Sequence, residues 1–213
     1  MTTATRPATA SGSRSLAVQL LWLTVAWNVI EGVIAVTSGI FARSVALVGF
    51  GLDSFIEVTA ALILLWRLNL PAHDERAERR EHAAHRVVGV TFMALAAYIL
   101  AQAAYTLASG ERPEGSGVGL SLAIVSLILM PGIGLLKQRN ARKLRSRALI
   151  AESKETLICS YLSVTLVIGL GANAALGWWW ADIAAALAMV PWILKEGQEG
   201  LRGEGCEDDG DSC

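Results

Sequence analysis

The chain has 213 residues, of which 54% are apolar and only 17% are charged, and its formal net charge is −1. Several separate apolar runs of about 20 residues, each long enough to cross ~30 Å of hydrocarbon, exclude a soluble globular domain and predict a polytopic helical membrane protein. Its three cysteines, Cys159, Cys206 and Cys213, form no framework of spaced pairs, so we expect no structural disulfide.

Six membrane spans are predicted along the chain. The first 14 residues, rich in Thr, Ala and Ser, are expected to form a disordered tail. The apolar run after them is too long for the core of a signal peptide. The predicted spans cover residues 15–40, 44–66, 87–108, 118–136, 149–176 and 179–194. They define a transmembrane domain over 15–195, followed by a short acidic tail at 196–213 with no C-terminal soluble domain.

Lysine and arginine collect on one side of these spans. That side receives both termini, the connector between spans 2 and 3 and the basic connector at 137–147, whereas the other side has only Arg43 and Arg112. Because basic loops are retained in the cytoplasm, both termini are predicted to be cytoplasmic, in the cell (inner) membrane. Retention and anionic lipid account for the basic runs, so the lipid bilayer is an expected partner and nucleic acid is not.

Span 1 contains two polar residues, Asn28 and Glu31, three positions apart on one helix face. They are expected to hydrogen-bond a neighbouring helix. The alternative is a supporting or proton-relay role for Glu31, since carboxylates at membrane depth tend to be functional.

Two carboxylates interrupt the second predicted span near its middle. Asp53 and Glu57 are four residues apart, so on a helix they lie one turn apart on the same face. A charge at membrane depth costs about several kcal/mol, and such residues face a protein interior or a wet cavity with partners. Because the two carboxylates also repel each other, we expect this face to receive a positively charged ligand.

The fifth predicted span carries a matching polar stripe. Glu152, Glu155, Cys159 and Ser163 follow one another at steps of three, four and four along one helix face. Glu155 and Cys159, together with the span 2 pair, could close four donors around one ion, the number that zinc prefers. The alternative is that Glu155 reaches water near the cytoplasmic end of the span while Cys159 packs as a small apolar residue.

A cluster of carboxylates around one site would also bind and release protons. Mutual repulsion favours protonation while the site is empty. Metal binding would expel these protons, because metal ligands must be deprotonated. Alternation between a dication and protons is the minimum machinery of metal–proton exchange.

Two further groups of possible ligands have simpler explanations. The connector between spans 2 and 3 contains His73, His82 and His85 among alternating charges, which are more typical of a solvated helix start than of a metal site. Cys206 and Cys213 flank several acidic residues and could collect cytoplasmic metal loosely, but a disordered acidic tail is the expected interpretation.

Three motifs together resemble the cation diffusion facilitator (cation efflux) family, in its transmembrane domain only. Span 2 carries Ser44-Val-Ala-Leu47 ahead of its carboxylate pair, and span 5 carries the polar stripe after Ala151. The segment Gly177-Trp-Trp-Trp-Ala-Asp182 resembles the family's entry to span 6. The resemblance covers about residues 15–200. It implies an all-α membrane protein of six transmembrane helices with a metal site shared by spans 2 and 5, at Asp53, Glu57, Glu155 and Cys159.

The chain departs from the family pattern at two ligand positions. Glu155 stands where the family usually has histidine, and Cys159 where it has aspartate. A thiolate favours Zn, Cd or Co over Mg and Mn, and we expect Zn as the transported ion with no other cofactor. The family usually has a soluble metal-binding domain after span 6. The 19 residues from Lys195 are too few to fold one, so a homodimer would form its contacts within the membrane.

The predicted function is secondary transport that exports divalent transition-metal cations (Zn, Cd or Co) from the cytoplasm by proton antiport. The alternative is a non-transporting membrane metal sensor or scaffold with the same fold. An intramembrane enzyme is not expected, because no predicted span contains histidine and no serine–base or metalloprotease motif is present.

Overall fold

The computed structural model describes residues 8–68, 75–144 and 146–202, which form six α-helices and no strand. Each predicted span coincides with one helix, and the first five helices are long and apolar enough to cross a membrane. The predicted all-α membrane fold is therefore confirmed. The helices are α1 (Ala8–Ala42), α2 (Val45–Leu68), α3 (Glu75–Ser109), α4 (Gly117–Leu144), α5 (Arg147–Leu176) and α6 (Trp180–Arg202).

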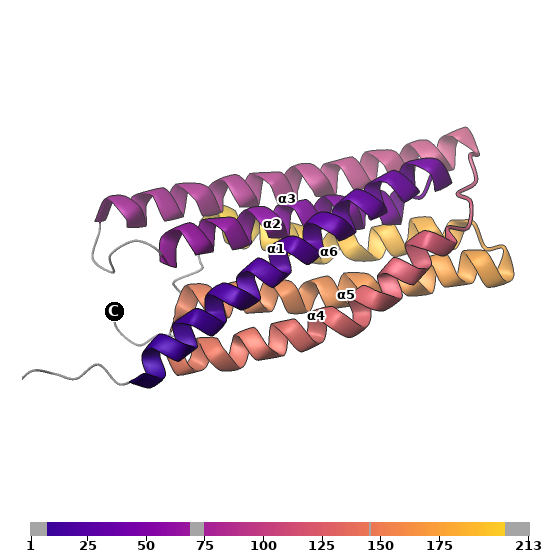
Figure 1. The fold of residues 1–213 in the computed structure, drawn as a ribbon. Helices are drawn as coiled ribbons and strands as arrows, with labels where there is room; N and C mark the ends of the chain where they lie inside the picture. The colour runs from indigo at the N-terminus through magenta and orange to yellow at the C-terminus, as the bar shows by residue number, and fades with distance from the viewer. Residues whose placement is uncertain (1–7, 69–74, 145, 203–213) are drawn as a thin grey trace, which may run out of the picture.

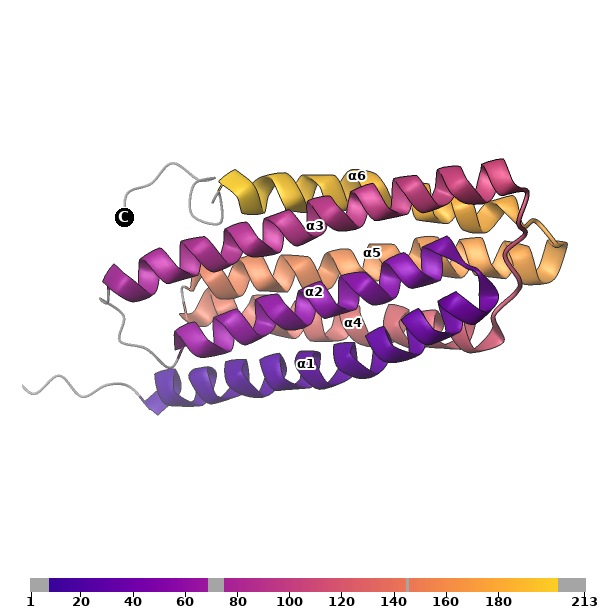
Figure 2. The same ribbon diagram turned by 90° about the horizontal axis from the view of Figure 1, so that it is seen from above.

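The helices run lengthwise in an elongated bundle, and α1 begins at the same end at which α6 finishes (Figures 1 and 2). The most extensive packing joins α1 to α2, α4 to α5 and α3 to α6. Helix α2 also contacts α3, α5 and α6, which places it at the centre of the bundle. At the α1–α2 contact the two backbones meet at Gly51, where an added Cβ would lie 2.8 Å from the Val36 nitrogen.

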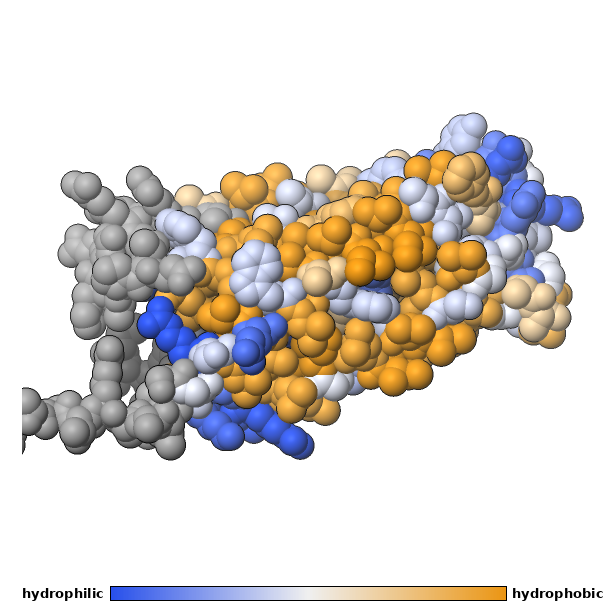
Figure 3. All heavy atoms as spheres, viewed as in Figure 1, coloured by the Kyte–Doolittle hydropathy of each residue, from blue (hydrophilic) through white to orange (hydrophobic). Residues whose placement is uncertain are grey.

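The face of the bundle that Figure 3 shows is apolar along its middle and polar toward its ends. Large side chains such as Phe41 and Ile128 are 85% and 74% exposed. A contiguous apolar surface of this kind marks contact with lipid or with another protein. The interior core gathers around α2 and α5, with Phe50, Leu162 and Leu166 buried.

Both ends of the helical domain extend beyond the predicted boundaries. Residues 8–14, expected in a disordered tail, form the first turns of α1. They are held there because the Asn140 amide donates to the Ser13 carbonyl at 2.7 Å and the Arg14 guanidinium donates to the Leu68 carbonyl. Residues 196–202, expected in the acidic tail, continue α6, where Gly197 is buried against α3.

The expectations for several other residues fall outside what the structure describes. They concern residues 1–7, the remaining acidic tail with its two cysteines, and the side chains of the connector histidines.

An acidic cap joins the beginning of α2 to α6. The Ser44 hydroxyl donates to one Asp182 carboxylate oxygen at 2.5 Å, and the Val45 N–H donates to the other at 2.9 Å. The Leu47 N–H donates in turn to the Ser44 hydroxyl at 3.0 Å. A carboxylate at a helix N-terminus satisfies free N–H groups and complements the helix dipole. The motif that begins at Ser44 and the motif that ends at Asp182 thus fix α2 against α6 ahead of Asp53.

Asp182→Asn tests this cap. The amide keeps the shape of the side chain but removes the charge and one acceptor oxygen. We expect the free energy of unfolding to fall by about 1–2 kcal/mol, measured by denaturant unfolding of the detergent-purified protein. Ser121→Ala is the control, because that exposed hydroxyl binds a carbonyl of its own helix, and it should change the free energy by less than about 0.5 kcal/mol. Equal effects of the two variants would contradict a stabilising cap.

Candidate metal-binding pocket

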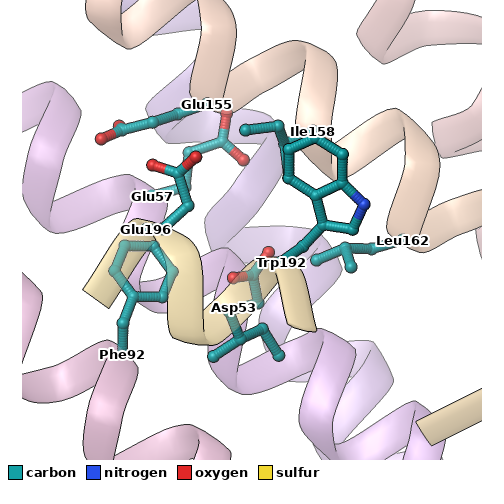
Figure 4. Close-up of a pocket in the computed structure, with 9 residues that line it drawn as sticks. Asp53, Glu57, Phe92, Glu155, Ile158, Leu162, Trp192 and Glu196 are labelled. Atoms are coloured by element: carbon teal, nitrogen blue, oxygen red, sulfur yellow. The ribbon is translucent and has the colours of Figure 1, made fainter. Parts of the chain in front are cut away.

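An acidic pocket lies inside the bundle between α2, α3, α5 and α6. Its carboxylates are Asp53 and Glu57 from α2, Glu155 from α5 and Glu196 from α6 (Figure 4). The cavity has a volume of about 20 Å³, which is room for roughly one water molecule or one ion. The other side chains around it are apolar: Phe92, Ile158, Leu162, Trp192 and Ile193.

The helical register of α2 places its two carboxylates on the buried face that packs against α5 and α6. Asp53 is 7% exposed and Glu57 is 5% exposed. The structure thus brings Asp53, Glu57 and Glu155 to one cavity, as the spacing indicated. In the part of the chain that the structure describes, however, no three Asp, Glu, Cys or His side chains converge closely enough to coordinate one ion. The metal-ligand assignment therefore stays a prediction, and coordination would require side-chain rotation.

Cys159, the fourth predicted ligand, does not line the pocket. It is 1% exposed and belongs to the apolar core. Ser163, next along the predicted stripe, donates its hydroxyl to the Cys159 carbonyl at 2.9 Å within the same helix. Cys159 therefore does not reach the cavity, and it could ligate an ion there only if its side chain turned toward the pocket.

A buried polar chain connects α4 to the pocket. The Lys137 ammonium, fully buried, lies 2.5 Å from a Glu152 carboxylate oxygen and donates to the Thr156 hydroxyl at 2.9 Å. The Thr156 hydroxyl donates to Glu57 Oε1 at 2.8 Å. Glu57 Oε2 receives no hydrogen bond from any described residue. This series of polar contacts therefore holds one oxygen of Glu57 and leaves the other oxygen available to a ligand.

Two residues of this region were assigned elsewhere from the sequence. The sequence predicts Lys137 in the basic connector and Glu196 in the acidic tail, whereas Lys137 is fully buried in α4 and the half-buried Glu196 of α6 lines the pocket. Lys137 lies four residues after the buried Ile133, and Glu196 lies four residues after Trp192 of the pocket. Continuing the helical face past the apolar run would have found both side chains.

The bundle and its pocket define the class of the protein: a multi-pass membrane protein with a buried, ion-sized acidic cavity. The family model of the cation efflux transmembrane domain matches residues 21–202. The chain therefore belongs to the cation efflux family, whose members transport metal cations, and the resemblance seen in the sequence motifs is confirmed.

Two relatives show how far the similarity extends. Transmembrane protein 163 of Xenopus laevis is 29% identical over 163 residues, which are 76% of this chain and 58% of the relative. An uncharacterized transporter of Synechocystis sp. is 27% identical over 165 residues, which are 75% of this chain and 53% of the relative. The chain spans little more than half the length of either relative.

The Lys137–Glu152 pair makes a sharp prediction about stability. Lys137→Met leaves a buried carboxylate without its cation, so we expect the free energy of unfolding to fall by about 3–5 kcal/mol. The double variant Lys137→Met/Glu152→Leu removes both charges of the pair, so it should recover most of that loss. Denaturant unfolding measures the free energy of unfolding of both variants.

The matched control for this pair is Lys195→Met, because Lys195 and its partner Glu199 are 58% and 45% exposed at 3.6 Å. An exposed pair is worth less than about 1 kcal/mol. If the double variant were as unstable as Lys137→Met alone, the loss would not come from the unpaired charge.

Proposed function

We propose that the protein exports a divalent transition-metal cation from the cytoplasm in exchange for protons. The observation that carries this proposal is the meeting of Asp53, Glu57 and Glu155 at one ion-sized cavity, in a chain that belongs to the cation efflux family. Three carboxylates without a cation inside the cavity repel one another, so the pocket favours either protons or a dication. The same residues can therefore bind both transported ions in turn.

The neighbouring groups support metal binding in this pocket. Thr156 holds Glu57 Oε1 and leaves Oε2 unbound by any described residue, which is the state in which that carboxylate can accept a metal. Glu196 lies near the end of α6 that is proposed to face the cytoplasm, where a further carboxylate would attract an incoming cation. Rocking of the helices against one another would open the pocket alternately to the two sides.

The donor set favours Zn, Cd or Co, with Zn first. Carboxylate oxygens and a thiolate suit borderline ions better than Mg or Mn. This preference depends on Cys159, which would have to turn from the core into the pocket when the ion arrives.

Orientation and assembly belong to the same proposal. Both termini are proposed to be cytoplasmic, in the cell (inner) membrane, and two copies are proposed to associate through membrane-embedded surfaces. The basic side chains at the end where α1 begins and α6 finishes support this orientation. They include Arg14, Arg67, Arg86, Arg139, Arg142, Lys143, Lys195 and Arg202.

Metal uptake into proteoliposomes under a pH gradient tests the proposal. Asp53→Asn and Glu155→Gln each remove one carboxylate from the pocket, and we expect each to lower the initial rate of Zn uptake at least about tenfold. Glu114→Gln, in the exposed connector between α3 and α4, is the matched control and should transport at the wild-type rate. Equal uptake rates in all four proteins would contradict the assignment of these residues to the metal site.

Cys159→Ala separates the role of the thiol from that of the carboxylates. We expect it to reduce Cd uptake more than Zn uptake, because the softer ion loses more when sulfur is removed. Competition between the two ions in the same vesicles measures the ratio. An unchanged ratio would show that the thiol does not ligate the ion.

A second candidate function is a non-transporting metal sensor or scaffold. The observation in its favour is that the predicted ligands do not converge on one point among the described residues. It predicts metal binding without flux, which the same proteoliposomes together with metal analysis of the purified protein would reveal.

A further inference from the structure

Helix α6 contributes a carboxylate to the acidic pocket, in addition to those of α2 and α5. Glu196 lines the same cavity of about 20 Å³ as the three carboxylates proposed to bind the metal (Figure 4). Trp192, four residues earlier on α6, lines it as well. Residues four apart share one face of a helix, so Glu196 continues the face of α6 that borders the cavity.

The rotation of α6 about its own axis is fixed by a close backbone contact with α3. A Cβ added to Gly89 would lie 2.7 Å from the Leu201 nitrogen and 2.9 Å from the Gly197 carbonyl oxygen. Glycine at position 89 therefore permits this approach of the two backbones. Because Gly197 is buried against α3, the preceding residue, Glu196, points about 100° away around the helix. That direction is the side of α6 that borders the acidic pocket.

No ion pair within the described part of the chain explains the position of Glu196. The neighbouring cation, Lys195, lies with its ammonium 3.6 Å from a Glu199 carboxylate oxygen and 5.0 Å from the centre of the Trp192 ring. Glu196 itself forms no hydrogen bond or ion pair with a described residue. Its carboxylate therefore borders an acidic cavity without a partner that would offset the repulsion from the other carboxylates.

The α2 carboxylates on the same cavity are also available to a cation. Asp53 is 7% exposed and forms no hydrogen bond or ion pair with a described residue. Glu57 is 5% exposed, and its Oε2 has no partner while Thr156 holds its Oε1. Polar groups buried this deeply need partners, and the remaining side chains around the cavity are apolar. Protons neutralise these groups in one state of the proposed exchange, and a cation does so in the other.

We propose that Glu196 is a direct ligand of the divalent cation in the acidic pocket, so that α2, α5 and α6 each hold the ion. This inference rests on the proposed function of the pocket, and it is independent of Cys159, because four carboxylates already supply the four donors that zinc prefers. The side chains would rotate toward the ion on binding, since they do not converge in the described structure. A cation bound in this way ties α6 to the other two helices.

The simpler role of Glu196 is attraction at a distance, because a carboxylate near the cavity draws cations whether or not it touches them. A ligand and an attracting charge differ in what can replace them. A neutral imidazole binds zinc through a ring nitrogen but has no negative charge. Histidine at position 196 can therefore replace a ligand, whereas it cannot replace an attracting charge.

The zinc affinity of the full chain, purified in detergent, tests the assignment by competition with a fluorescent zinc indicator. Every protein has Cys206 and Cys213 replaced by serine, so that no tail thiol competes for the ion, and the buffer is at about pH 8, where imidazole is neutral. We expect Glu196→Gln to raise the Kd at least about tenfold, and Glu196→His to return it to within about threefold of the parent value. Adding Asp53→Asn to Glu196→His should abolish this recovery, because the imidazole would bind the ion together with Asp53.

Glu199 supplies the matched control, because it lies three residues further along α6 and is 45% exposed in its pair with Lys195. Glu199→Gln and Glu199→His should both leave the Kd within about twofold of the parent value. If Glu196→His bound zinc as weakly as Glu196→Gln, the carboxylate would act only through its charge, and the ligand assignment would be overturned. An unchanged Kd in Glu196→Gln beside weakened binding in Asp53→Asn overturns this inference alone. An unchanged Kd in both variants overturns it together with the proposed function of the pocket.

Discussion

The buried ion pair between Lys137 and Glu152 is the interaction on which the interior of this bundle depends. An ammonium and a carboxylate can both remain inside apolar surroundings only while they are paired, because either one alone is strongly destabilising there. The pair fixes the contact between α4 and α5. It also orients the Thr156 hydroxyl, which in turn holds Glu57. The acidic pocket thus depends on a contact made outside it.

Helix α2 is fixed at its beginning by a different acidic contact. Asp182 accepts hydrogen bonds from Ser44 and from the first free N–H groups of α2, so α6 and α2 are joined before the membrane-embedded carboxylates begin. With both the beginning and the middle of α2 held, its rotation about its own axis is determined. Asp53 therefore faces α5 and α6 while Ser54, the next residue, faces α1.

This arrangement gives α2 two polar sides with different chemistry. One side has several carboxylates around a small cavity, which suits a dication or protons. The other side faces one carboxylate, that of Glu31 on α1, to which the Ser54 hydroxyl donates a hydrogen bond.

The sequence by itself determined the elements and one side of the site. Runs of about 20 apolar residues must become helices in a bilayer, and a spacing of four places Asp53 and Glu57 on one helix face. Tertiary structure decided which neighbours that face meets. A helical pattern shows that Lys137 and Cys159 point inward, but not that Glu152 pairs with the lysine or that the thiol stops short of the cavity. Those outcomes depend on how separate helices pack against one another, and the spacing of residues within one helix does not determine that packing.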